Sequence, residues 1–167
     1  MKHKTLHLLL LLIGITTYSQ NSLDELLKKH NNDNMPYISV TELYQLQSHG
    51  DVSILDSREK NEFDVSHIPS AIFVGYNYFS VEEFSEKTKD KDTPIVVYCT
   101  LGIRSNVVAN KLKNEGYTNI KNLYGGLIEW KNKGYTIVDI TETETENVHT
   151  FSKQWNKWLK NGRAVYE

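Results

Sequence analysis

The chain contains, at residues 96–105, the stretch Val96-Val97-Tyr98-Cys99-Thr100-Leu101-Gly102-Ile103-Arg104-Ser105. An apolar run ends at the only cysteine, a short loop with one glycine follows, and the residues beyond it have helical spacing. Backbone N–H groups of such a loop and of the first helical turn converge on one point, which stabilises an anion and lowers the pKa of a cysteine. We therefore predict that Cys99 is a reactive thiolate and that Arg104 adds a positive charge at the far end of the loop.

Short apolar runs alternate with stretches of helical period along the middle of the chain. The predicted strands are 37–40, 52–55, 71–74, 95–98 and 119–123, and the predicted helices are 41–48, 59–65, 81–87, 105–115 and 127–133. This alternation predicts an α/β fold with a mainly parallel central sheet flanked by helices. Ligands of such sheets bind outside the carboxyl ends of the strands, where Cys99 is expected to lie.

The first 19 residues have the pattern of an export signal. Lys2 and Lys4 give a positive start, residues 8–15 form an apolar centre, and Thr17-Tyr18-Ser19 ends it. The apolar run is shorter than the roughly 20 residues of a membrane-spanning helix, so we expect cleavage near Ser19 and no stable membrane insertion afterwards. The mature protein is expected to be exported, either periplasmic or secreted.

Charge and cysteine content narrow the function further. The chain has 19 basic and 21 acidic residues, and loss of Lys2 and Lys4 leaves 17 against 21, a formal charge of −4. This acidic balance argues against nucleic acid as a partner. One cysteine permits no internal disulfide, which in an exported protein favours a chemical role, although an inert buried thiol is the alternative. No cluster has metal-ligand spacing, and we expect no metal and no cofactor.

Four segments follow from these patterns: a signal peptide (1–19), a polar lead-in that packs loosely (20–36), the α/β domain (37–138), and an acidic connector with an extra C-terminal aromatic helix (139–167). In that last helix Phe151, Trp155, Trp158 and Leu159 share one face. We expect this face to dock on the core. A lid or a surface for a protein partner is the alternative.

Three motifs, in order, resemble the rhodanese family over about residues 37–135. The loop from Cys99 to Ser105 is similar to the six-residue active-site loop of single-domain rhodaneses. The upstream motif joins an Asp-x-Arg and a His-Ile-Pro stretch, here Asp56-Ser57-Arg58 and His67-Ile68-Pro69. The downstream motif is a Gly-Gly-x-x-x-Trp segment, here Gly125-Gly126 with Trp130. The chain departs from the family pattern at Ser66 and Ser70, where glycine is usual, and we expect these changes to alter a turn near the site.

The resemblance implies sulfur transfer through a persulfide on Cys99, from thiosulfate or a similar anion to a thiol acceptor, or to cyanide in an assay. Its implied substrate-binding residues are Thr100, Leu101, Gly102, Ile103, Arg104, Ser105 and Arg58. Asp56 and His67 are expected to give structural support, Ser105 to cap the following helix, and Glu62 to pair with a nearby arginine.

Two other functions compete with this interpretation. Phosphatases and arsenate reductases of related fold carry His-Cys, five residues and Arg, whereas here Tyr98 precedes Cys99 and only four residues separate it from Arg104. A non-catalytic sulfur carrier or interaction module, using the C-terminal helix as a partner surface, is the second alternative. Turnover at Cys99 separates that alternative from an enzyme.

Overall fold

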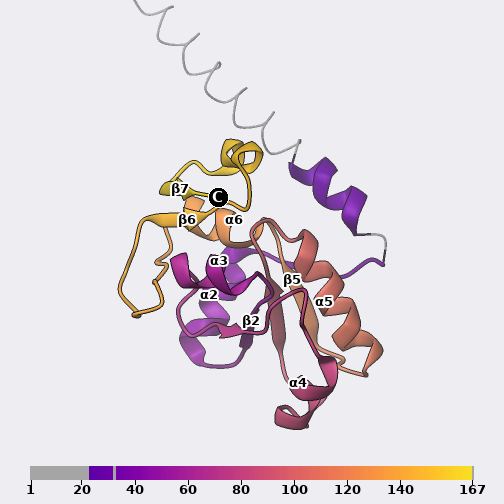
Figure 1. Cartoon of the computed structure of the whole chain (residues 1–167). Coiled ribbons are helices and arrows are strands. Elements are labelled where there is room, and N and C mark those ends of the chain that lie inside the picture. The colour runs from indigo at the N-terminus through magenta and orange to yellow at the C-terminus, as the bar shows by residue number, and fades with distance from the viewer. Residues whose placement is uncertain (1–22, 32, 167) are drawn as a thin grey trace, which may run out of the picture.

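The computed structural model describes residues 23–31 and 33–166, so the predicted export signal lies outside the described residues. Within them, five strands form a parallel sheet in the order β1-β5-β4-β2-β3 (Figure 1). The predicted α/β fold with a mainly parallel sheet is therefore confirmed. No helix in this described part is both long and apolar enough to cross a membrane.

The bounds of the elements follow the predicted order closely. The strands of the sheet are β1 (Tyr37–Ile38), β2 (Ser53–Asp56), β3 (Ile72–Phe73), β4 (Ile95–Tyr98) and β5 (Ile120–Leu123). The helices are α2 (Val40–His49), α3 (Lys60–Val65), α4 (Val81–Lys87), α5 (Ile103–Asn114) and α6 (Gly126–Asn132).

The strand β4 occupies the centre of the sheet, between β2 and β5, and all four of its residues are buried. Successive side chains of a strand point to opposite faces. Val97 accordingly packs with Val108 and Leu112 of α5 on one face, whereas Val96 packs in the cluster that holds residues of α2 and α6 on the other. A strand buried on both faces explains the unbroken apolar run that precedes Cys99.

The helix α5 begins at Ile103, two residues earlier than predicted. Gly102 has φ +111 and is the N-cap, because a residue without a Cβ adopts this left-handed conformation at little cost. Ser105 therefore lies inside the first turn. The prediction that Ser105 caps this helix is wrong.

The polar lead-in contains a helix at residues 23–30 that is firmly packed. Leu23 and Leu27 are 4% and 1% exposed and belong to the main core. The Asn106 side-chain amide also donates to the carbonyl of His30 (3.0 Å). The expectation of loose packing is wrong, because two leucines one turn apart supply a sufficient apolar face.

The C-terminal segment differs most from its prediction. The expected aromatic helix is a short 3₁₀ helix, η1 (Lys153–Trp158), between two unpredicted strands that pair in parallel, β6 (Asn147–His149) and β7 (Arg163–Val165). Three-residue strands are too short to show a period of two. Trp155, Trp158 and Leu159 pack on the core as predicted.

Phe151, by contrast, contacts Trp155, with ring centroids 4.9 Å apart, but does not dock on the core. It has φ +66 and is 49% exposed.

The acidic connector that precedes Phe151 lies against the domain, because Val138 forms bridges with both His67 and Glu144. Figure 1 shows the resulting C-terminal segment, in yellow, beside α6.

Candidate active site

Cys99 lies directly after β4, at the carboxyl end of the central strand, as predicted. Its side chain is fully buried. Its Sγ accepts a hydrogen bond from the backbone N–H of Gly102 at 3.1 Å. The loop therefore directs at least one amide at the sulfur atom.

The Gly-Gly motif fixes the opposite side of this loop. The carbonyl oxygens of Cys99 and Thr100 accept hydrogen bonds from the backbone N–H groups of Leu127 (2.9 Å) and Ile128 (3.2 Å), in the first turn of α6. A Cβ on Gly126 would lie 2.2 Å from the Cys99 oxygen, so only glycine permits this approach. The start of α6 thus binds the loop carbonyls.

Asn122 of β5 is a site residue that the sequence analysis missed. Its Nδ2 donates to the Gly102 carbonyl, and its Oδ1 accepts from the Ser105 hydroxyl, both at 2.8 Å. Asn122 is fully buried. A polar amide inside a predicted apolar strand was the available signal, because buried amides need specific partners.

Arg104 forms a buried ion pair with Glu62 of α3. Nη1 and Nη2 donate to the two carboxylate oxygens at 2.5 and 2.7 Å, and Nη2 also donates to the Thr100 hydroxyl at 3.1 Å. The predicted pairing of Glu62 with an arginine is confirmed, and Arg104 is the partner. The bidentate geometry fixes the plane of the guanidinium group beside the loop.

Opposing effects set the pKa of Cys99. Burial raises it, whereas the charge of Arg104 and hydrogen bonds from Ser105 and from the Gly102 amide lower it, and the lowering effects prevail. Glu62 shows the same balance: burial raises its pKa, but the hydrogen bonds and the charge of Arg104 hold the pKa far below the usual range. Cys99 therefore lies in surroundings that favour the thiolate.

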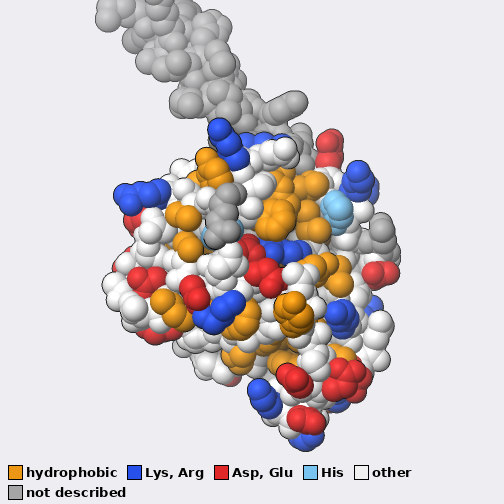
Figure 2. All heavy atoms as spheres, viewed as in Figure 1, with side chains coloured by type: hydrophobic (Ala, Val, Ile, Leu, Met, Phe, Trp, Pro, Cys, Tyr) orange, Lys and Arg blue, Asp and Glu red, His pale blue; other side chains and the backbone are white. Residues whose placement is uncertain are grey.

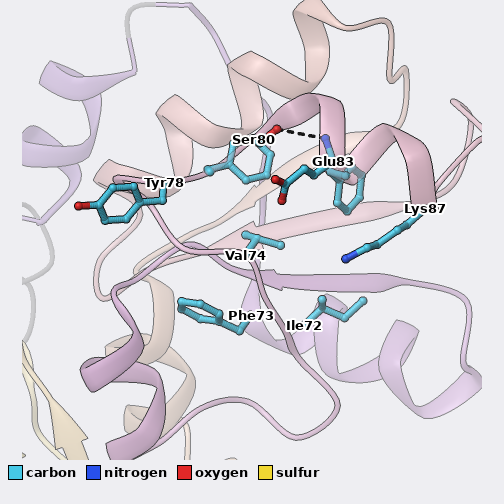
Figure 3. A pocket seen from close by; sticks show the side chains of 9 residues that line it. Ile72, Phe73, Val74, Tyr78, Ser80, Glu83 and Lys87 are labelled. Atoms are coloured by element: carbon cyan, nitrogen blue, oxygen red, sulfur yellow. Dashed lines mark hydrogen bonds between the residues drawn. The ribbon is translucent and has the colours of Figure 1, made fainter.

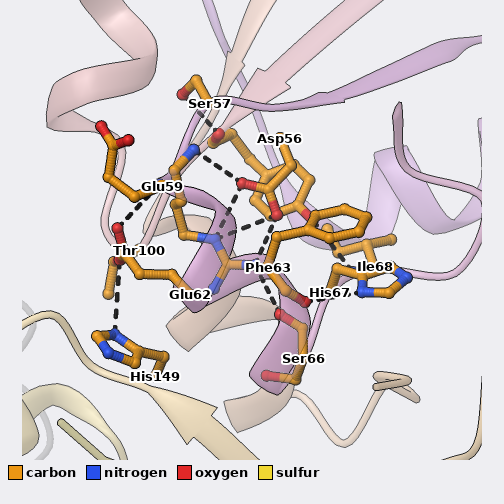
Figure 4. Close-up of polar contacts among 12 residues, drawn as sticks. Asp56, Ser57, Glu59, Glu62, Phe63, Ser66, His67, Ile68, Thr100 and His149 are labelled. Atoms are coloured by element: carbon orange, nitrogen blue, oxygen red, sulfur yellow. Dashed lines mark hydrogen bonds and ion pairs between the residues drawn. The ribbon is translucent and has the colours of Figure 1, made fainter. Parts of the chain in front are cut away.

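Asp56 and Arg58 form a second buried pair, with both side chains fully buried. Arg58 Nη2 donates to Asp56 at 2.6 Å and to the Ser66 carbonyl at 2.6 Å, which ties the end of β2 to the end of α3 (Figure 4). These are structural contacts, in line with the predicted supporting role of Asp56. The predicted contact between Arg58 and substrate stays a prediction.

His67 is also buried and makes structural contacts. Its ring stacks on Phe63 with centroids 3.8 Å apart, and Nδ1 lies 3.0 Å from the Phe63 carbonyl oxygen. Its Nε2 lies 3.3 Å from Glu142 Oε1. The contacts agree with the predicted supporting role. Trp130, predicted to be a core residue, is 1% exposed.

Two C-terminal residues reach the same site, and the sequence analysis did not predict either. Nδ1 of His149 lies 3.6 Å from Oε1 of Glu62. Figure 4 shows Glu62 between Thr100 and His149. The ring centroid of Phe151 lies 4.8 Å from Cζ of Arg104. Figure 2 shows this side of the molecule, where acidic, basic and hydrophobic side chains meet near the centre of the view.

A shallow pocket of about 150 Å³ lies elsewhere, between β3 and α4 (Figure 3). Its lining is mixed, with the apolar rings of Phe73 and Phe84 beside the polar side chains of Glu83 and Lys87. The Ser80 hydroxyl there accepts the backbone N–H of Glu83, so it caps α4. The pocket holds no cysteine or histidine among its lining residues, and it does not compete with Cys99 as a reactive centre.

The residues described here also contain no group of three His, Cys, Asp or Glu side chains suited to a metal ion.

The fold and the loop together define a class: a small parallel α/β domain with a cysteine-containing active-site loop at the end of its central strand. Residues 39–133, more than half of the chain, match the rhodanese-like domain family. The chain belongs to this family.

Comparison with known proteins agrees with this assignment. The chain is 35% identical over 94 residues to the thiosulfate sulfurtransferase GlpE of Coxiella burnetii, covering 56% of this chain and 85% of that protein. It is 32% identical over 103 residues to a tRNA uridine(34) hydroxylase of Aster yellows witches'-broom phytoplasma, covering 59% of this chain but 33% of that protein. A rhodanese-related protein of Thermoplasma volcanium superposes with a TM-score of 0.51 at 28% identity, covering 62% of this chain and 97% of that one.

Proposed function

We propose that the protein is a sulfurtransferase that takes the outer sulfur of thiosulfate, or of a similar sulfur-donating anion, and passes it to a thiol. The observation that carries this proposal is the geometry at Cys99, whose sulfur accepts the Gly102 N–H and lies in the field of Arg104. The likeness to a thiosulfate sulfurtransferase supports the choice of donor.

The first half-reaction loads the cysteine. The Cys99 thiolate attacks the outer sulfur of thiosulfate, a new S–S bond forms, and the bond to the sulfonate sulfur breaks with its electron pair leaving on sulfite. One thiolate and one thiosulfate dianion thus become one persulfide anion and one sulfite dianion, so charge balances. Because the product is again an anion on sulfur, the amide and the guanidinium that favour the thiolate also favour the persulfide.

The second half-reaction unloads the cysteine. An acceptor thiolate, or cyanide in an assay, attacks the terminal sulfur, and the electron pair of the S–S bond returns to Cys99. The products are the acceptor persulfide, or thiocyanate, and the free Cys99 thiolate. The scheme needs no general base, because the attacking group is already ionised.

Thiocyanate formation from thiosulfate and cyanide tests this proposal, with Cys99→Ser as the matched variant. We expect turnover with ping-pong kinetics in the unaltered protein and background rates in the variant, whose hydroxyl has a far higher pKa. Equal rates in both proteins would exclude the thiosulfate activity and favour a carrier or an interaction module.

We also propose that the protein acts outside the cytoplasm, which rests on the signal-like pattern of residues 1–19. Expression in a bacterial host followed by intact-mass measurement tests it. A periplasmic product that begins near Gln20 is the expected result, and an uncleaved cytoplasmic product would contradict it.

A further inference from the structure

Two residues outside the matched family domain contact the Glu62–Arg104 pair. We infer that the C-terminal segment 147–165 completes the active site, and that Phe151 is a positioning residue that holds Arg104 beside Cys99. The observations are the Phe151 ring 4.8 Å from Cζ of Arg104 and the His149 Nδ1 3.6 Å from Glu62. The inference deepens the proposed function and rests on it for its catalytic meaning, whereas the contacts themselves do not depend on turnover.

The backbone of Phe151 is strained toward this contact. A bulky residue at φ +66 occupies the left-handed region, which the surrounding structure must enforce. The preceding Thr150 is fully buried, and its N–H donates to the Val165 carbonyl at 2.8 Å. The N–H of Phe151 itself donates to Nδ1 of His149 at 3.2 Å. These bonds hold the ring between Trp155 of η1, with ring centroids 4.9 Å apart, and the guanidinium group of Arg104.

The segment that carries Phe151 is anchored independently of the site. The strands β6 and β7 pair over three residues each, and Trp158 is 7% exposed. The ammonium group of Lys131, in α6, pairs with Glu146 at 2.7 Å, although Glu146 is largely exposed and the bond adds little stability. The position of Phe151 beside Arg104 is therefore set by strand pairing and core packing outside the site.

The contact changes the surroundings of a charge that acts on Cys99. Arg104 is 9% exposed, and a charge with little access to water has a stronger effect on its neighbours. The aromatic face also attracts the guanidinium directly. Removal of the ring would admit water to the guanidinium group, which would weaken the effect of Arg104 on the sulfur even while Glu62 still holds it.

Ionisable groups from several elements act either on this sulfur or on the Glu62–Arg104 pair, and those that act on the sulfur itself dominate its pH dependence. Arg104 of α5 and Tyr37 of β1 interact electrostatically with Cys99. Glu62 of α3, His149 of β6 and Arg58 act on it through the Glu62–Arg104 pair. Because Phe151 is uncharged, its replacement alters the environment of these groups without removing one.

The test is the rate constant for alkylation of Cys99 by iodoacetamide, measured from about pH 5 to pH 10, a range that spans the ordinary cysteine pKa. The full mature chain is compared with Phe151→Ala and with the conservative Phe151→Tyr. We expect the alanine variant to react about three to ten times more slowly at pH 7, with its profile moved to higher pH, and the tyrosine variant to match the unaltered protein. Tyr78→Ala, which removes a ring that is 94% exposed, is the control and should change nothing.

A folded Phe151→Ala variant with an unaltered pH profile would overturn the inference. Phe151→Leu keeps apolar bulk without the aromatic face, so it replaces the alanine variant if that chain does not fold, and an unaltered profile there has the same meaning. Alkylation requires no sulfur transfer. A profile that depends on Phe151 in a protein that forms no thiocyanate would therefore support the positioning role and reject only the proposed function.

Discussion

The two buried arginine–carboxylate pairs use the same chemistry in different surroundings. Asp56 and Arg58 are two residues apart, and Arg58 also bonds the carbonyl of Ser66. Glu62 and Arg104 are 42 residues apart and join α3 to the first turn of α5, next to Cys99. The comparison teaches that burial and pairing do not distinguish the two arginines; their neighbours do, because Arg104 is the one whose charge acts on Cys99.

The largest effect is expected from Arg104→Met, which leaves Glu62 buried and unpaired. The free energy of unfolding should fall by about 3–5 kcal/mol, as for other broken buried pairs, and alkylation of Cys99 at pH 7 should slow by about tenfold. Urea denaturation and iodoacetamide kinetics measure the two effects.

The double variant Arg104→Met with Glu62→Leu separates these effects. It removes the unpaired carboxylate, so the free energy of unfolding should be at least about 1 kcal/mol higher than in Arg104→Met. Alkylation of Cys99 should stay as slow as in that single variant. Recovery of thiol reactivity in the double variant would show that Arg104 does not act on Cys99 through its charge.

Arg58→Met should affect stability alone. We expect a loss of about 3–5 kcal/mol, because Asp56 is then buried without its partner, but a change of less than about twofold in alkylation of the folded protein. Lys60→Met, which removes a cation from an exposed pair with Asp64, is the matched control and should change stability by less than about 0.5 kcal/mol. A tenfold slower alkylation of Cys99 in Arg58→Met would mean that both arginine–carboxylate pairs act on Cys99. The two pairs would then not differ in function.

Acid should weaken the Glu62–Arg104 pair. The pKa of Glu62 is held below its usual range in the folded protein. A glutamate in the unfolded chain has a pKa of about 4.3. Ionisation of Glu62 therefore stabilises the fold, and this contribution is fully present above the unfolded-state pKa. This stability is lost as pH falls from about 5 toward the lower pKa of the folded state. Urea titrations at several pH values should therefore show a flatter acid slope for Glu62→Gln. Glu42→Gln, at an exposed helix cap, is the control variant. If it lowered the slope of the unfolding free energy against pH as much as Glu62→Gln does, Glu62 would not be the main source of the acid sensitivity.

The smallest effect is expected at Ser70, which directly follows the His-Ile-Pro segment. Ser70 has φ +65, a conformation that glycine adopts without strain. Ser70→Gly should raise the free energy of unfolding by at most about 0.5 kcal/mol, because the greater freedom of glycine in the unfolded chain offsets part of the relief. Thermal unfolding measures this, and Cys99 reactivity should not change.

The sequence predicted the elements that long periodic patterns define. The parallel sheet, the place of Cys99 at the end of β4 and the apolar face of α5 all follow from local spacing. It did not predict Asn122, His149 or Phe151, because their roles depend on contacts between segments far apart in the chain. Glu62 was expected to pair with an arginine, but only the fold distinguishes Arg104 from Arg58.

Ser70 shows the same limit of sequence analysis, here at a residue that the analysis did single out. Glycine is usual there in the family that the motifs resemble, and the structure supplies the reason, since the backbone is left-handed. The sequence could mark the turn as altered, yet it could not show that serine keeps the glycine geometry. Backbone strain becomes visible only when the dihedral angle is known.

The complete burial of Cys99 has a consequence for contacts between two copies of this protein. A disulfide between two copies would require their Cys99 Cα atoms to come within about 7 Å, which the surrounding loop and helices prevent. Small oxidants and single sulfur atoms face no such steric demand. The enclosure of Cys99 therefore disfavours a disulfide between two molecules while leaving the thiol open to small reactants.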